Sequence, residues 1–341
     1  WGWGRGQAYV TLMYAKMLED EYEVFVLKQG TNPIADEFEE VNAIITEYPK
    51  YNVEKKVFKE WIRENDLDAV VFNEYNQWTI DEQNLVKVAK EMGVKVYGYL
   101  VTEKFKPGQE KDYDRIWAPT MSFVRNMRKN KVRKFTYIPY SIDLNEFEVK
   151  DVKNTKFTFF HQGGWGGVHS RKNTRQVIEA FKALDKPDTR LVITSQISID
   201  MELPENIIIL NKEHTRKEMI DYFKSADAFV QPSKWETIGI PILEAMASGL
   251  PVITCDIPPM NEFVRPGING YLANGTMKDY PGISIQGMDV DILDLKAKME
   301  TMLNPTIYSM LTKNSRAVVE KIYDLEKNKK YLLEFLKEDL K

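Results

Sequence analysis

The sequence has 341 residues, of which 43% are hydrophobic and 29% are charged, and its formal net charge is −4. These values are typical of a globular protein of about two domains, and the net negative charge does not favour general nucleic-acid binding. No apolar run approaches the roughly 20 residues that span a bilayer, and a single cysteine excludes an internal disulfide and a cysteine-based metal cluster. We therefore expect a cytoplasmic protein.

The first half of the chain alternates between patterns typical of strands and of helices. Residues 1–6 hold three glycines and predict a loop, which an amphipathic helix follows up to residue 18. We expect further strands at residues 22–27, 41–45, 69–72 and 94–101, and further helices at residues 53–63, 82–91 and 122–134. Such alternation favours a parallel, doubly wound sheet.

Two stretches of this half carry candidate binding groups. Residues 73–78 read Asn-Glu-Tyr-Asn-Gln-Trp after a predicted strand, which suits either a sugar that stacks on an aromatic ring or an ordinary polar loop. Six basic residues gather in the helical stretch 122–134, namely Arg125, Arg128, Lys129, Lys131, Arg133 and Lys134. They form either a solvated helix face or a surface for anionic lipid headgroups or an anionic acceptor.

The second half repeats the alternation. We expect strands at residues 157–160, 191–194, 207–210, 228–230 and 250–254, and helices ending at 181 and over 215–225, 241–248, 290–303, 308–322 and 325–340. Between the first of these strands and its helix lie a glycine-rich loop, residues 163–167, and the cations Arg171 and Lys172. A glycine loop that leads into a helix with cations at its start is a general phosphate site. Its spacing fits neither a Walker loop nor a dinucleotide fingerprint.

The stretch 228–256 predicts a strand, a loop, a short helix and a second strand. In an open α/β sheet ligands bind beyond the carboxyl ends of the strands, and the loop 236–240 lies there. Its amide groups open a helix and suit phosphate oxygens, and Gly239 allows close approach of a ligand. Glu236 and Glu244 flank this anion site, where carboxylates are useful if they accept hydrogen bonds from hydroxyls. A sugar nucleotide, which carries phosphates and many hydroxyls, fits such a site.

Residues 236–253 read Glu-Thr-Ile-Gly-Ile-Pro-Ile-Leu-Glu-Ala-Met-Ala-Ser-Gly-Leu-Pro-Val-Ile. This string resembles the donor-site signature of the retaining GT-B glycosyltransferases of family 4, also called glycosyl transferases group 1. Residues 262–272 resemble the segment that follows it in that family, and residues 137–147 resemble its inter-domain hinge, with Ser141 in place of the usual glycine. The resemblance is strong over 226–273, moderate over 136–181 and weak over 1–135.

The resemblance implies an α/β protein with the GT-B fold, in which two Rossmann-like, doubly wound domains face each other across a cleft. It implies an N-terminal acceptor domain over residues 1–148, a nucleotide-sugar donor domain over 155–320, and a C-terminal helix, 321–341, that crosses back to the first domain. The composition changes over 148–156, where we place the boundary. The family's first strand has no counterpart here, so we expect a few residues to precede Trp1.

The resemblance also implies the substrates and the site. The donor is a nucleoside-diphosphate sugar, with UDP or GDP favoured, the acceptor hydroxyl is unidentified, and no metal or other cofactor is required. Glu236 binds the sugar hydroxyls and Glu244 the ribose hydroxyls. The residues expected to bind the donor are Gly6, Gly164, Arg171, Lys172, Glu236, Thr237, Ile238, Gly239, Ile240 and Glu244. The expected catalytic groups are Glu236, Lys172 and Glu103.

Two departures from the family pattern keep other functions open. Thr102 stands where many members carry a histidine, and the loop position of an expected arginine holds glycine or Trp165, so that Arg171 has to supply the second charge. A non-catalytic partner subunit of the same fold therefore remains an alternative, as does a sugar-nucleotide epimerase. A dinucleotide-dependent oxidoreductase ranks below both, because the chain lacks the fingerprint loop with an acidic residue roughly 20 positions on.

Overall fold

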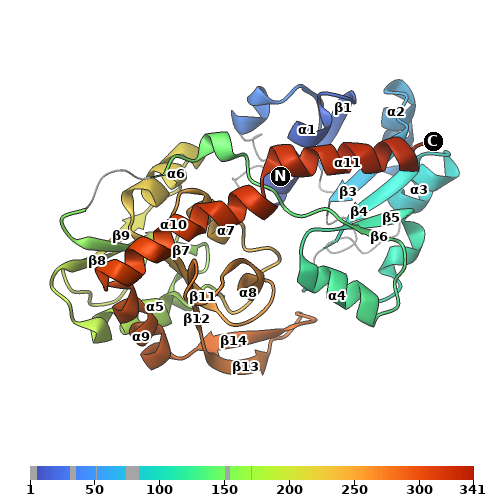
Figure 1. The fold of residues 1–341 in the computed structure, drawn as a ribbon. Helices are drawn as coiled ribbons and strands as arrows, with labels where there is room; N and C mark the ends of the chain where they lie inside the picture. Colours follow the sequence, from blue (N-terminus) through green and yellow to red (C-terminus); the bar gives the residue numbers. More distant parts are fainter. Residues whose placement is uncertain are drawn as a thin grey trace. The chain divides into compact units, whose positions relative to one another are not determined.

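The computed structural model describes residues 6–30, 36–50, 52–73, 84–100, 102–103, 105–149, 154–169 and 171–341. The chain divides into two compact units. Unit 1 comprises Trp1–Ser141 and Leu325–Lys341, and unit 2 comprises Ile142–Asp324 (Figure 1). The division falls a few residues before the composition change at 148–156. Of the candidate binding stretch 73–78, residues 74–78 lie outside the described residues.

Unit 1 consists of parallel strands covered by helices. Its strands are β1 (Val24–Gln29), β2 (Ala43–Tyr48), β3 (Ala69–Asn73), β4 (Lys95–Tyr99), β5 (Arg115–Ala118) and β6 (Phe135–Tyr137). Strands β1 and β2 form a parallel pair, and the other four form a parallel sheet in the order β3-β4-β5-β6. Its helices are α1 (Gly6–Leu18), α2 (Lys55–Glu64), α3 (Leu85–Glu91), α4 (Met121–Lys129) and α11 (Leu325–Asp339), with short 3₁₀ turns η1 (Asp36–Glu40) and η3 (Gln109–Asp112).

Helix α4 ends earlier than its sequence pattern predicts. It begins at a Thr120 cap, whose Oγ1 accepts the backbone N–H of Phe123 at 3.2 Å, and it buries Phe123 and Met127. The helix stops at Lys129, and Lys131 has φ of +58°. The expected continuation to residue 134 is therefore wrong, because a left-handed residue breaks the helical hydrogen-bond series.

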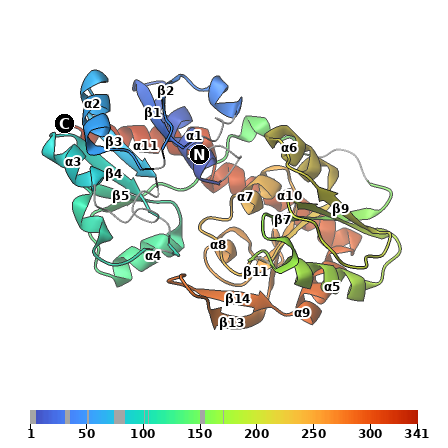
Figure 2. The same ribbon diagram turned by 180° about the vertical axis from the view of Figure 1, so that it is seen from behind.

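Helix α11, from the end of the chain, packs in unit 1. In both views it runs beside α1 (Figures 1 and 2). Asp339 near its end accepts the Tyr97 hydroxyl at 2.8 Å and an Arg115 N–H at 3.1 Å, and the Arg115 guanidinium lies over the Phe335 ring. These contacts hold the helix against strands β4 and β5, about 240 residues earlier in the chain.

Unit 2 is built on one six-stranded parallel sheet, in the order β12-β11-β10-β7-β8-β9. Its strands are β7 (Phe157–Gly164), β8 (Thr189–Ser195), β9 (Ile207–Asn211), β10 (Ala228–Gln231), β11 (Val252–Cys255) and β12 (Gly270–Ala273). Its helices are α5 (Thr174–Leu184), α6 (Arg216–Ser225), α7 (Ile240–Ala247), α8 (Met260–Phe263), α9 (Ile292–Met302) and α10 (Pro305–Ile322), with 3₁₀ turns η4 (Leu144–Glu146) and η5 (Gly167–His169).

The strand order identifies the place where a ligand is expected. From β7 the chain moves to β8 and β9 on one side, and then to β10, β11 and β12 on the other. Right-handed crossovers therefore place α5 on one face of the sheet and α6 and α7 on the opposite face. The order reverses between β7 and β10, and open α/β sheets bind ligands at the carboxyl ends of strands at such a point.

An antiparallel hairpin that the sequence patterns did not predict follows β12. It comprises β13 (Gly275–Asp279) and β14 (Gln286–Val290), and it pairs as a separate two-stranded sheet. No helix in the described part of the chain is both long and apolar enough to cross a membrane.

Candidate functional site

The candidate site lies where β7 and β10 end. Strand β7 runs into the glycine loop, and a Cβ on Gly163 would lie 3.0 Å from the carbonyl oxygen of Thr194 on the neighbouring strand. Gly164 has φ of +64°, a conformation that other residues rarely adopt. Glycine at these two positions allows the chain to turn sharply at the end of β7, beside β8, before it reaches residues 171–174.

His161 fastens this loop to the neighbouring strand. Its Nδ1 lies 2.7 Å from the carbonyl oxygen of Val230 on β10, and its Nε2 lies 2.9 Å from Oγ1 of Thr174, the first residue of α5. Burial lowers the pKa of His161 to about 4, so the ring is neutral at pH 7. His161 is therefore a structural tie between β7, β10 and α5.

Asn173 fixes the residues that carry the two cations. It is fully buried and has φ of +55°, which asparagine tolerates better than most residues. Its Nδ2 donates to the carbonyl oxygen of Pro232 at 2.7 Å and to that of Met288, in β14, at 3.1 Å. Arg171 and Lys172, directly before it, are thereby held against the chain that leaves β10.

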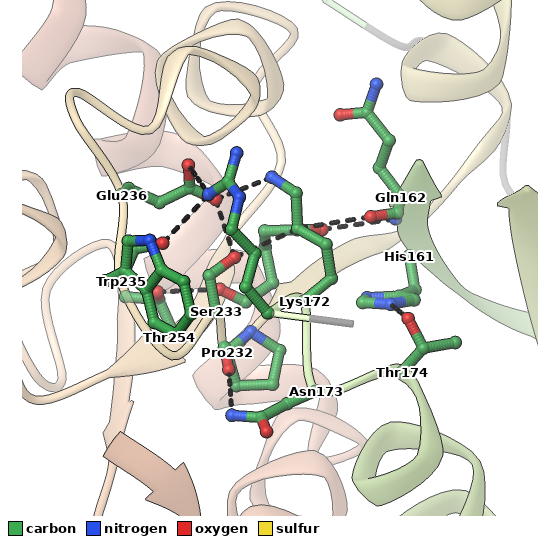
Figure 3. Close-up of polar contacts among 12 residues, drawn as sticks. His161, Gln162, Lys172, Asn173, Thr174, Pro232, Ser233, Trp235, Glu236 and Thr254 are labelled. Atoms are coloured by element: carbon green, nitrogen blue, oxygen red, sulfur yellow. Dashed lines mark hydrogen bonds and ion pairs between the residues drawn. The ribbon is translucent and has the colours of Figure 1, made fainter. Parts of the chain in front are cut away.

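Three donors converge on the carboxylate of Glu236 (Figure 3). The ammonium of Lys172 lies 2.6 Å from Oε1, and the Ser233 hydroxyl donates to the same oxygen at 2.7 Å. Arg171 donates to Oε2 at 2.5 Å and to the Trp235 carbonyl oxygen at 2.9 Å. The Glu236 side chain is 6% exposed, Lys172 is 13% exposed and Arg171 is 40% exposed.

Among the described residues, two cations and one carboxylate make up this cluster, so their charges do not cancel. Burial alone would raise the pKa of Glu236, but the charges and hydrogen bonds of Arg171 and Lys172 outweigh burial and hold that pKa below its usual range. Burial, reinforced by Arg171 and opposed by Glu236, lowers the pKa of Lys172 from its ordinary value. One carboxylate thus sits with two cations, and the excess positive charge suits an anion.

Helix α7 begins at Ile240, four residues after Glu236, and adds to this positive field. Gly239 precedes it with φ of +91°, and Pro241 lies in its first turn. The helix starts one residue earlier than predicted, and Ser248 is its C-terminal cap rather than a helical residue. Backbone N–H groups at the start of a helix have no intrahelical partner and favour anions. The loop of Thr237, Ile238, Gly239 and Ile240 therefore carries a second anion-attracting element.

Glu244 lies farther along α7 in a separate ion cluster. Its side chain is 7% exposed, and its Oε1 accepts an N–H of Arg216. Arg216 also donates to Oε2 of Glu146 at 3.1 Å and 2.9 Å. The predicted donor residues of unit 2 thus fall into two groups, one around Glu236 and one around Glu244, joined by the loop and first turns of α7.

Other predicted residues belong to unit 1. Gly6 is the first residue of α1 rather than a loop residue, because the first helical position needs no intrahelical N–H bond. Thr102 and Glu103 are buried, with exposed fractions of 7% and 9%. Asn73, the last residue of β3, ties the start of α1 by donating to the Gln7 carbonyl oxygen at 3.1 Å and to Thr11 Oγ1 at 2.9 Å.

The structure adds residues that sequence reasoning missed, namely His161, Asn173, Ser233 and Arg216. Ser233 lies within the stretch 228–256, so its polar side chain directly after an apolar strand was a usable signal. Arg216 carried no such signal. In the described part of the chain, no group of three or more His, Cys, Asp or Glu side chains is arranged to hold a metal ion.

Comparison with known sequences finds similarity to glycosyltransferases. Residues 165–279 match the sequence model of the family described as glycosyl transferases group 1. A mannosyltransferase of lipopolysaccharide core biosynthesis from Rhizobium meliloti, LpsB, is 30% identical over 120 residues, which are 31% of this chain and 34% of that protein. An Escherichia coli α-1,3-galactosyltransferase, named for UDP-Gal and GlcNAc-diphosphoundecaprenol, is 27% identical over 164 residues, 41% of each chain. These alignments span less than half the length of either relative.

Solved structures extend the likeness to the whole chain. HepE from Anabaena in complex with UDP superimposes with a TM-score of 0.75 at 14% identity, over 99% of this chain and 98% of that one. Sucrose-phosphate synthase from Thermosynechococcus elongatus gives 0.74 at 14% identity, over 98% and 93%. At these identities the likeness is one of fold. Residues 165–279, which contain the Glu236 site, thus match the glycosyl transferases group 1 family, and the chain has the GT-B fold.

Proposed function

We propose that this protein is a retaining glycosyltransferase that moves a sugar from a nucleoside-diphosphate sugar to a hydroxyl of an acceptor. One observation carries the proposal: among the described residues, two cations, Arg171 and Lys172, share the buried carboxylate of Glu236, four residues before the start of α7. The excess positive charge and the helix N-terminus suit a diphosphate, and the carboxylate suits sugar hydroxyls.

The donor's diphosphate binds Arg171, Lys172 and the amides of residues 237–240 in this proposal. An ammonium has three donors and a guanidinium has five, so each cation can hold Glu236 and a phosphate oxygen together. Both cations stabilise the negative charge that develops on the departing diphosphate. We therefore propose that transfer needs no metal ion.

Glu236 binds hydroxyls of the transferred sugar in this proposal. The bond between the anomeric carbon and the diphosphate oxygen breaks, and a bond from that carbon to the acceptor oxygen forms on the same face. The acceptor's proton passes to the departing diphosphate oxygen, so that the configuration is retained and no enzyme nucleophile is consumed. Glu103, which belongs to unit 1, stays a candidate catalytic group by resemblance.

Thermal unfolding with nucleotides tests the donor class. UDP, GDP, ADP and NAD are each added without metal and then with Mg²⁺; the name of the E. coli relative makes UDP the first choice. A ligand at 100 times its Kd stabilises the folded state by about 2.7 kcal/mol, which shifts the melting temperature measurably. We expect one nucleoside diphosphate to raise it equally with and without Mg²⁺. A shift with NAD alone contradicts the proposal.

Product analysis separates the remaining alternatives. A transferase forms a glycosylated product from the sugar nucleotide only when an acceptor is present. An epimerase converts the sugar nucleotide into its epimer without an acceptor. A non-catalytic partner subunit does neither. The acceptor is a glycan, a lipid or a small molecule in this proposal, and a panel of all three classes is needed.

We also propose that α4 and the turn after it contact an anionic membrane surface. The six basic residues between 125 and 134 are all exposed, and no acidic residue lies between 121 and 134. Such a cluster is attracted to anionic headgroups by about 1 kcal/mol per basic residue near the surface.

A further inference from the structure

Arg216, the first residue of α6, has the contacts of a residue that positions another side chain. Its guanidinium donates to Oε1 of Glu244, on α7, and to Oε2 of Glu146, on η4. The same guanidinium lies 5.2 Å from the centre of the Phe147 ring. Arg216 thus connects three elements that are not neighbours in the sequence.

The Arg216–Glu244 ion pair is largely buried, so the Glu244 carboxylate depends on Arg216 for its charge compensation. The Arg216 side chain is 15% exposed and that of Glu244 is 7% exposed. A carboxylate so far removed from water needs a charged partner, and a planar guanidinium fixes the direction of the carboxylate as well as neutralising it. Because Arg216 occupies Oε1, Oε2 is the oxygen assigned here to a ligand.

Arg216 is itself held in place. Thr215 caps α6 by accepting the N–H of Glu218 at 3.2 Å, and the Glu218 carboxylate accepts the Thr215 N–H at 2.9 Å. This reciprocal cap fixes the first turn of α6, where Arg216 lies. The two hydrogen bonds to Glu146 then fix the guanidinium, whose fork is pre-organised for such pairing.

We propose that Arg216 is a positioning residue that aims the Glu244 carboxylate at the ribose 2′- and 3′-hydroxyls of the bound nucleoside diphosphate. This inference rests on the proposed function, because Glu244 is assigned to the ribose there. It adds that the affinity gained from the ribose depends on Arg216, a residue that does not touch the ligand. Loss of Arg216 leaves a buried carboxylate that turns toward other donors and no longer offers Oε2 to the ribose.

The test compares a nucleoside diphosphate with its 2′,3′-dideoxy form, using whichever of UDP, GDP or ADP binds best. Hydrogen bonds to a charged group favour the ribose form, so we expect the wild-type protein to bind it at least about tenfold more tightly. In Arg216→Gln the two Kd values are expected to come within about threefold of each other. Arg216→Lys retains a charge and should keep part of the preference, which guards against a failure of the glutamine variant to fold.

Arg316→Gln is the matched control. Arg316 is another arginine that holds the same segment, donating to the carbonyl oxygens of Phe147 at 2.8 Å and Leu144 at 3.3 Å, and it reaches α7 at the Ala247 carbonyl oxygen rather than at the Glu244 side chain. The Arg316→Gln variant should be less stable than the wild type but should still bind the ribose form more tightly than the dideoxy form. Equal loss of preference in both variants, or an unchanged preference in Arg216→Gln, overturns the inference while the proposed function stands. A wild-type protein that binds no nucleoside diphosphate overturns the proposed function and the inference with it.

Discussion

The ammonium of Lys172 lies 2.6 Å from Oε1 of Glu236, although 63 residues separate them in the chain. The same oxygen accepts the Ser233 hydroxyl, so two donors set the orientation of one carboxylate oxygen. Arg171 donates to Oε2, so three of the carboxylate's roughly four acceptor positions are taken, and the remaining one, on Oε2, can take a ligand hydroxyl without breaking the pair.

Replacing Glu236 by glutamine should abolish most activity and weaken unit 2. The amide keeps the shape, but it leaves Lys172 and Arg171 with no carboxylate between them. We expect kcat to fall at least about hundredfold, as misplacement at a reacting centre does, and the free energy of unfolding to fall by about 2 kcal/mol. Transfer assays and urea unfolding measure the two effects.

Glu300→Gln is the control for that change. Glu300 is a carboxylate of α9 that pairs with Lys296 at 2.6 Å, with a side chain that is 44% exposed. Its loss should leave kcat within about twofold, since surface pairs contribute about 0–1 kcal/mol. Equal activity of Glu236→Gln and wild-type protein would contradict a role for Glu236 in transfer.

Replacing Lys172 by methionine should weaken nucleotide binding. The variant keeps the buried stem and removes the charge, so Kd for the best nucleoside diphosphate is expected to rise about tenfold or more, since charge-assisted hydrogen bonds to phosphate are strong. Isothermal titration measures it. Lys182→Met removes a cation from the same helix region, where Lys182 pairs with Glu179 at 3.7 Å, and should leave Kd unchanged. If both variants bind as the wild type does, Lys172 is not a phosphate ligand.

Stability should fall with acidification through His161. Its pKa in the folded protein is about 4, below the ordinary 6.5. The imidazole therefore binds a proton below pH 6.5 in the unfolded chain, but only below about pH 4 in the folded protein. Protonation of this group lowers the free energy of unfolding by about 3 kcal/mol between pH 6.5 and pH 4, at 1.36 kcal/mol per pH unit. Below pH 4 both states are protonated, so the group lowers the stability no further.

Urea unfolding between pH 7 and pH 5 isolates this contribution, because the lowered carboxyl pKa values act at lower pH. His161→Asn should be less stable at pH 7, since it loses at least one of the two hydrogen bonds, but its stability should decline less steeply toward pH 5. Parallel pH profiles for the two proteins would show that His161 does not keep its lowered pKa.

The α4 surface should bind anionic vesicles. The protein is expected to sediment with vesicles of mixed phosphatidylserine and phosphatidylcholine at low salt and to be released at high salt, as screening predicts. Reversing the charge of Arg128, Lys129 and Arg133 should abolish sedimentation. The same triple reversal at Lys55, Lys56 and Lys59 on α2 is the control. Failure of the wild-type protein to sediment would remove the membrane proposal and leave the transferase proposal untouched.

The sequence predicted the elements with strong apolar patterns. Strands such as β8 and β10 and helices α6, α10 and α11 lie within a few residues of their predicted bounds. Strands β5 and β6 were missed because they are short, with four and three residues, and their patterns resemble the basic stretch and loop around them. The β13–β14 hairpin was missed because its β13 side is almost entirely exposed and shows no apolar alternation.

The site divides in the same way. Glu236, Glu244 and the cations Arg171 and Lys172 stand in local patterns and were found. The pairing of Glu236 with both cations was not predicted, because each was assigned to the diphosphate rather than to the carboxylate. Arg216 and Glu244 are 28 residues apart, on different helices. Such a contact depends on how α6 and α7 pack, and neither helix's periodicity contains that information.

The β13–β14 hairpin connects the site to an exposed position on the protein surface. Strand β14 bonds to the site region: Met288 accepts from Asn173 Nδ2 and donates to the Lys234 carbonyl oxygen, and Asp289 pairs with the Lys234 ammonium at 3.0 Å. The tip, at Pro281 and Gly282, is exposed. A fluorescent label there would follow Tyr280, whose ring centre lies 4.7 Å from that of Trp235, the residue before Glu236. The hairpin is therefore a natural position for a reporter of nucleotide binding that does not itself occupy the site.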